Sequence, residues 1–145
     1  MPRARRELSE LIAFRSVADE RQYPREECVA AAEWVRGAFL DAGIESAELI
    51  ETIDGSYAVV GQRKAVGGAP TVLLYSHYDV QPPGDSALWA SEPFELTERD
   101  GRWYGRGSAD CKGNVVMHLL ALRALGSDWG VGVTVVSEGS EEMGT

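Results

Sequence analysis

A histidine and an aspartate stand two positions apart at the end of an apolar run, in the stretch YSHYDVQPPGD at residues 75–85. Because alternate side chains of an extended segment point to the same side, the carboxylate of Asp79 can lie beside the ring of His77. Asp79 would then accept a hydrogen bond from one ring nitrogen, while the other nitrogen binds a metal ion. Taken alone, the pair is better explained as a polar strand end, because this spacing often occurs by chance. A serine triad with Ser76 is disfavoured, since adjacent side chains of a strand face opposite sides.

Asp110 lies in the stretch WYGRGSADCKGN, just before an apolar segment that we expect to form a buried helix. The local sequence favours an N-cap role, which aspartate fills well, over a role as a metal carboxylate. Gly105 and Gly107 do not form a dinucleotide-binding fingerprint, because its third glycine would fall on Asp110.

Three glutamates, Glu138, Glu141 and Glu142, crowd the stretch SEGSEEMGT at residues 137–145. Neighbouring glutamates in a loop are usually solvated charges. A hydrolytic metal site, however, needs one carboxylate that holds the cation and another that takes a proton from water. Glu141 and Glu142 could divide these roles. Combined with a histidine and a further aspartate, they would form a zinc-like or mixed divalent site without a closed set of thiolates.

Hydrophobic periodicity predicts the elements that must position these residues. The predicted fold class is α/β, with helices on both faces of a mixed, mostly parallel sheet. Ligands of such sheets gather at the carboxyl ends of the strands, where His77 and the glutamates fall. The continuous apolar run at 71–77 indicates a strand buried on both faces. The expected elements are a first helix ending near Ser16, helices at 24–43 and 112–125, strands at 46–53, 56–62, 71–77 and 130–139, and a hairpin at 94–107 that turns at Asp100-Gly101.

The bulk properties exclude several classes of function. The chain has 145 residues, enough for one modest domain with a core, and its net charge of −9 argues against a nucleic-acid partner. Two cysteines, Cys28 and Cys111, are too few for a disulfide scaffold and favour a reduced setting. The N-terminus lacks the apolar region of a signal peptide, and no apolar run is long enough to cross a membrane. We therefore expect a soluble cytoplasmic protein without a membrane partner.

Three stretches in order resemble the successive metal-site motifs of the M20 metallopeptidases, and most closely those of the dipeptidase or carnosinase-like branch. The resemblance extends from about residue 7 to residue 145. It implies a zinc-peptidase-like catalytic domain that hydrolyses an amide bond in dipeptides or small peptides by means of a metal-activated water. The stretches are SHYDVQPPGDSALWASEPFEL at 76–96, GRWYGRGSADCKGN at 101–114 and SEGSEEMGT at 137–145.

The resemblance also assigns a role to each candidate residue. His77 would bind one metal ion, and Asp79 would orient its ring. Asp110 would bridge two ions, Glu142 would bind the second ion, and Glu141 would be the general base. The family uses two zinc ions, or manganese or cobalt, and its members often have a cis peptide bond after the bridging aspartate. We expect that bond between Asp110 and Cys111.

Two departures from the family pattern limit this interpretation. Cys111 stands where many relatives have aspartate or asparagine, and we expect a small buried side chain rather than a soft metal ligand. Relatives are several hundred residues long and supply another acidic ligand, a late histidine and a lid or dimerisation domain. His118, the other histidine, is expected to be a packed, hydrogen-bonded residue of its helix rather than to replace that ligand.

Residues 1–145 are therefore expected to be the N-terminal portion of a catalytic domain, without its C-terminal half and its lid or dimerisation domain. Such a chain would bind metal weakly, have little or no activity, and form a homodimer or self-associate through exposed sheet edges. Two alternatives stay open: an N-acyl-amino-acid amidohydrolase, such as a deacetylase or desuccinylase, and a non-catalytic truncated domain.

Overall fold

The computed structural model describes residues 2–144, and each helix and strand expected from the sequence is formed within them. The first helix ends at Ala13 instead of near Ser16, because Ser16 bonds to another segment. Its hydroxyl donates to the carbonyl oxygen of Tyr78, and its own carbonyl accepts from the amide of Val80. The helices are α1 (Pro2–Ala13), α2 (Arg25–Asp41) and α3 (Lys112–Leu125). The strands are β1 (Ser46–Glu51), β2 (Tyr57–Arg63), β3 (Thr71–His77), β4 (Thr97–Arg99), β5 (Arg102–Tyr104) and β6 (Gly132–Glu138).

Four of these strands form a mixed sheet in the order β1-β2-β6-β3, and β4 and β5 form a separate hairpin. β3 runs parallel to β6, whereas β2 is antiparallel to both β1 and β6. The hairpin turns at Asp100 and Gly101, as predicted. Both residues have positive φ angles, 50° and 71°, which fit a tight two-residue turn.

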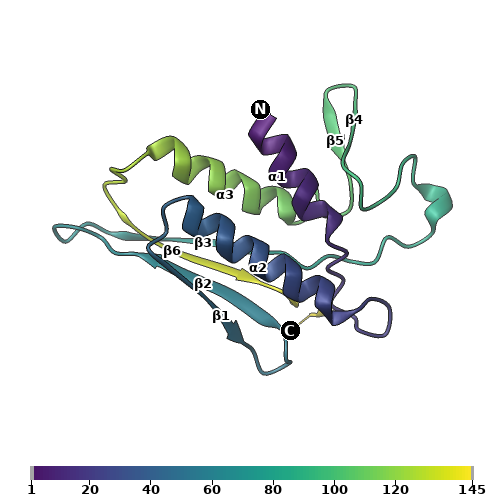
Figure 1. Ribbon diagram of the computed structural model, residues 1–145, viewed down its shortest axis with the longest axis horizontal. Coiled ribbons are helices and arrows are strands. Elements are labelled where there is room, and N and C mark those ends of the chain that lie inside the picture. Colours follow the sequence, from purple (N-terminus) through teal and green to yellow (C-terminus); the bar gives the residue numbers. More distant parts are fainter. Residues whose placement is uncertain (1, 145) are drawn as a thin grey trace.

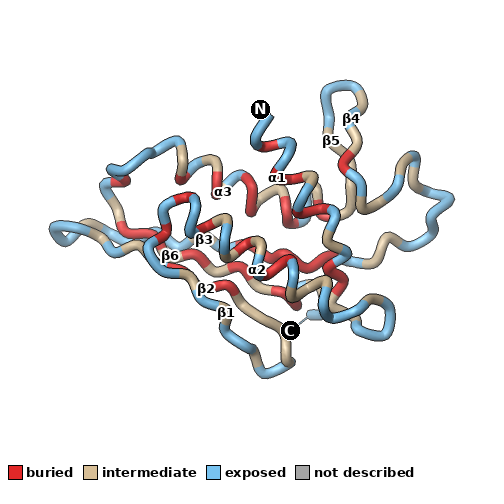
Figure 2. The backbone as a smooth tube through the Cα atoms, viewed as in Figure 1, coloured by how far each residue is buried: buried red, intermediate tan, exposed pale blue. Residues whose placement is uncertain are grey.

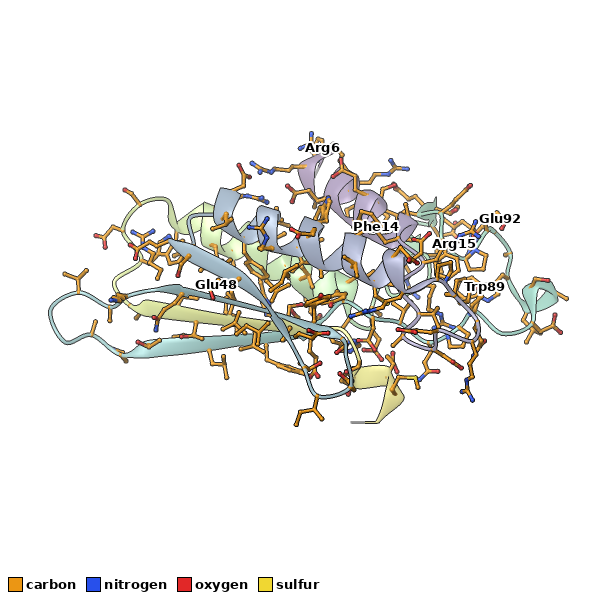
Figure 3. The ribbon with its side chains drawn as sticks, turned by 60° about the horizontal axis from the view of Figure 1, so that its bottom comes forward. Arg6, Phe14, Arg15, Glu48, Trp89 and Glu92 are labelled. Carbon is orange, nitrogen blue, oxygen red and sulfur yellow. The ribbon has the colours of Figure 1, made fainter. Side chains whose placement is uncertain are left out.

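The α/β class and the mixed sheet are confirmed, but the layering differs from the expectation. One of the three strand pairings in the sheet is parallel and two are antiparallel, so the sheet is not mostly parallel. The short turn between β1 and β2 accounts for the antiparallel pairing of these two strands. Figure 1 shows all three helices over one face of the sheet, and Figure 3 shows the same arrangement from another direction. In the described part of the chain, the opposite face therefore has no helical cover.

The strand at 71–77 was expected to be buried on both faces, and this prediction is wrong. β3 lies at the edge of the sheet, and the side chains of Val72, Leu73 and Tyr75 are exposed. Only its last residues, Ser76 and His77, are buried. An apolar run predicts a strand, but it does not reveal which other elements cover that strand.

The main core lies between the sheet and helices α2 and α3 (Figure 2). Helix α2 buries the face predicted from its spacing, with Ala32, Val35 and Phe39 inaccessible and Cys28 partly buried. A smaller cluster joins α1 to α3 through Leu8, Ile12, Val116 and neighbouring side chains. None of the described helices has the length and apolarity needed to cross a membrane.

The segment directly after β3 is buried and held from several sides. Tyr78, Asp79 and Val80 have at most 1% of their surface exposed. The amide of Tyr78 donates to the carbonyl oxygen of Glu138, and its hydroxyl donates to that of Tyr57 at 2.6 Å. Together with the two bonds to Ser16, these contacts fix the backbone on which Asp79 stands.

Gly139 is predicted to be indispensable for this packing. A Cβ atom at position 139 would lie 2.2 Å from the Tyr78 hydroxyl oxygen and 2.5 Å from its ring carbon Cζ. Tyr78 is buried and bonded, so it has little room to move. We expect Gly139→Ala to lower the free energy of unfolding by about 1–3 kcal/mol, measured by urea denaturation.

The matched control is Gly37→Ala in α2, where no atom lies within 4 Å of the added carbon. This change should stabilise the protein by about 0.5–1 kcal/mol, because alanine favours a helix interior. Equal stabilities of the two variants would contradict the steric account of Gly139.

Candidate metal centre

The candidate residues meet where β3 and β6 end side by side. The two strands are parallel, and His77 pairs in register with Glu138. The chain then continues from β3 to Asp79, and from β6 into a short 3₁₀ turn, Glu141–Met143. Asp110 approaches from the loop before α3. The sequence predicts that these segments converge at one edge of the sheet, and the backbone has this arrangement.

His77 lies at the centre of this group, with 5% of its surface exposed. Its Nδ1 atom is 3.2 Å from Asp79 Oδ1, and its Nε2 atom is 3.0 Å from Asp110 Oδ1. A second carboxylate oxygen, Glu141 Oε2, lies 3.7 Å from Nε2. Burial lowers the pKa of His77, but the surrounding carboxylates outweigh burial, so the pKa is raised overall. The ring is therefore placed among negative charges that also attract a cation.

Asp79 links the two strand ends. Its Oδ2 atom accepts the backbone amide of Glu142 at 2.9 Å, and its Oδ1 atom faces the His77 ring. The side chain is completely buried, and burial raises the pKa of Asp79 to about 6. The carboxylate thus holds the turn that carries the glutamates through one oxygen and lies beside the histidine with the other.

Glu142 is held a second time by Gln81, which sequence reasoning did not single out. Gln81 Nε2 donates to the Glu142 carbonyl oxygen at 2.9 Å and to its Oε2 atom at 3.0 Å. Gln81 follows Asp79 by two positions, so its position in the same motif could have indicated a role at the site.

Potential ligand atoms converge in two groups of three within the described residues. His77 forms one group with Glu141 and Glu142, and another with Asp110 and Cys111; in each group the three atoms lie within 4.8 Å of one another. The two groups share His77, whereas the family resemblance implies Asp110 as the shared ligand.

The residues fit a divalent cation. Asp79 Oδ1 is buried and has no hydrogen-bond partner among the described atoms, although it lies 3.2 Å from His77 Nδ1. An imidazole that binds a cation through Nε2 keeps its proton on Nδ1, and here the main-chain carbonyl oxygen of Asp79 lies 3.2 Å from Nδ1 and can accept that proton's hydrogen bond. One imidazole with several carboxylates is also a donor set that suits zinc and similar ions.

The favoured N-cap role of Asp110 is wrong. Helix α3 begins at Lys112, its cap position is Cys111, and no side chain caps it. The Asp110 side chain is instead 77% exposed and lies against His77 Nε2. The peptide bond between Asp110 and Cys111 is cis, as the resemblance predicts. Local sequence could not distinguish the two roles, because both place an aspartate before a helix.

Lys112 is a further residue that sequence reasoning missed. As the first residue of α3 it resembles a surface charge, yet it is completely buried, and burial lowers its pKa to about 7. Its Nζ atom donates to the carbonyl oxygen of Phe14, which is labelled in Figure 3 just after α1. This bond fastens the start of α3, next to Asp110, to the end of α1.

His118 lies in α3 as expected and is partly buried. Its Nδ1 atom is buried without a hydrogen-bond partner among the described atoms, and burial lowers its pKa. It belongs to neither group of potential ligands. The expectation that it packs within the helix is met, whereas the expected hydrogen bond is not found at Nδ1 within residues 2–144.

Comparison with known proteins identifies the family. The model of peptidase family M20/M25/M40 matches residues 73–145, half of the chain. A cysteinylglycine-S-conjugate dipeptidase of Corynebacterium striatum is 49% identical over 142 residues, which are 95% of this chain and 30% of that protein. A succinyl-diaminopimelate desuccinylase of Xanthomonas campestris is 52% identical over 54 residues, 37% of this chain and 14% of that protein.

Comparison of the fold with solved structures identifies the same family. The crystal structure of human carnosine dipeptidase 1 superimposes with a TM-score of 0.84 at 27% identity, covering 99% of this chain and 33% of that one. The chain thus spans about a third of the length of the dipeptidases it matches. From the matching family model and the shared fold, we conclude that the chain belongs to peptidase family M20/M25/M40.

Proposed function

We propose that this chain forms part of an enzyme that hydrolyses the amide bond of dipeptides or other small peptides with the help of divalent cations. The observation that carries the proposal is the convergence of Asp110, Glu141 and Glu142 around His77, whose ring lies beside the buried carboxylate of Asp79. The similarity to a dipeptidase over 95% of the chain supports this substrate class.

In this proposal, the cations are two zinc ions, with manganese or cobalt as substitutes, and His77, Asp110 and Glu142 are the ligands that this chain supplies. Bound divalent cations polarise a carbonyl group and lower the pKa of water. A catalytic zinc ion usually has three protein ligands, so a ligand set shared between two ions would be completed by further groups.

Glu141 is proposed as the general base. Its carboxylate is about half exposed, at 47%, so water and substrate can reach it, and it lies 3.7 Å from His77 Nε2. A carboxylate in this place can take a proton from the attacking water and pass it to the leaving amine. Glu142, whose carboxylate is fixed by Gln81, is better placed to hold a cation than to move a proton.

The second candidate function is hydrolysis of N-acyl amino acids, favoured by the 52% identity to a desuccinylase over 54 residues. The same residues would serve both reactions, so only substrate contacts separate them. Assays of the protein with dipeptides and with N-acetyl and N-succinyl amino acids distinguish the two, and turnover of only the acylated compounds would overturn the dipeptidase proposal.

We also propose that the protein is cytoplasmic and that it self-associates through β3. Both cysteines are free, which suits a reducing compartment.

β3 lies at the sheet edge with Leu73 and Tyr75 exposed, and such edges pair readily with another chain. Sedimentation of the protein and of a Leu73→Lys variant tests the second point, since the charge should reduce association.

In the whole enzyme of which this chain is proposed to form part, replacing Glu141 by glutamine should remove catalysis but not metal binding. The amide cannot accept the proton from water, so we expect kcat to fall by about 10²–10⁴-fold. Metal content, measured by mass spectrometry, should stay unchanged. The exposed Glu45→Gln serves as the control and should keep full activity. A fully active Glu141→Gln variant would exclude Glu141 as the base.

Replacing Asp79 by asparagine should weaken metal binding, although Asp79 is not itself a proposed ligand. Loss of the carboxylate beside His77 Nδ1 removes the group that orients the ring, so we expect zinc affinity to fall by about 10–100-fold. Competition with a chelating dye measures this affinity. The control is Asp128→Asn, which changes an exposed aspartate that is not among the candidate site residues. Equal affinity of the two variants would contradict the orienting role.

A further inference from the structure

The side chain of Cys111 lies beside two of the proposed metal ligands. Its sulfur belongs to a group with one His77 nitrogen and one Asp110 oxygen in which all three atoms lie within 4.8 Å of one another. The residue itself is buried, with 6% of its surface exposed. The side chain is small and buried, as expected, but its position near two proposed ligands favours the role of soft metal ligand that the sequence analysis disfavoured.

The surroundings of this sulfur suit a metal ligand. Asn114 Nδ2 lies 3.2 Å from Sγ and can donate a hydrogen bond to it. Cys111 also occupies the cap position of α3, at the end of the helix that carries partial positive charge. Both features place positive partial charge near the sulfur atom of Cys111.

Cys28 provides a contrast within the same chain. It lines a cavity of about 220 Å³ between α2 and the turns at Gly55 and Gly139, and none of the residues that line this cavity belongs to the two ligand groups. Burial raises the pKa of Cys28 to about 12. Since the sequence has two cysteines, Cys28 is a matched internal control for any measurement on Cys111.

We propose that Cys111 supplies a sulfur ligand at the His77–Asp110 half of the metal centre. This inference rests on the proposed metal centre, and it deepens it by assigning a preference among cations. Thiolate sulfur is a soft ligand that favours zinc and cobalt over manganese or magnesium. Binding would release the thiol proton to solvent and form the metal–sulfur bond in its place.

Cobalt(II) is the probe that tests this assignment. Sulfur bound to cobalt gives a charge-transfer absorption in the near ultraviolet, whereas nitrogen and oxygen ligands give only the visible d–d bands. We expect both signals when cobalt is titrated into the protein and into Cys28→Ser, in which Cys111 is the remaining cysteine. Cys111→Ser should lose the charge-transfer absorption and keep the visible bands.

Every outcome of this titration decides between specific alternatives. Visible bands without charge transfer in Cys28→Ser would overturn the sulfur ligand and leave the metal centre standing. Absence of both signals in the unaltered protein would contradict the metal centre as well.

A second variant, Cys111→Asn, keeps the test decisive if Cys111→Ser folds poorly. It restores a residue type that the family pattern allows at this position, and it should bind zinc less tightly relative to manganese than the unaltered protein. An unchanged ratio of zinc to manganese affinity would count against the proposal.

Discussion

The arrangement of the site depends on one buried carboxylate. Asp79 is completely inaccessible to solvent, so its charge must be stabilised by neighbouring groups. One oxygen accepts the amide of Glu142, and the other faces the His77 ring. His77 ends β3, and Glu142 lies in the turn after the adjacent parallel strand β6, so the side chain of Asp79 contacts both the histidine and the glutamate-bearing turn.

Contacts from several other parts of the chain hold Asp79 and its neighbours in place. Ser16 fastens the backbone on both sides of Asp79, and the Tyr78 ring packs into the core against Gly139. Lys112 ties the loop that carries Asp110 to the end of α1. The segments that meet here are far apart in the sequence, so the site exists only when helices α1 and α3 and strands β3 and β6 are packed together.

The sequence was informative where chemistry or turn geometry is local. The spacing of His77 and Asp79, the turn at Asp100-Gly101 and the buried face of α2 could all be predicted, because each depends on neighbours within a few residues. The exposure of β3 and the burial of Lys112 could not, since both depend on which distant segments cover them. Asp110 was ambiguous for the same reason: only the position of His77 distinguishes a ligand from a helix cap.

The central claim is that the side chains organised by Asp79 hold a divalent cation. Anomalous diffraction at the zinc absorption edge, from crystals of the protein grown with zinc, tests it most directly. The account predicts an anomalous peak in contact with His77 and with at least one of Asp110 and Glu142. Zinc bound only at other residues, or no anomalous peak at this edge of the sheet, would contradict the account.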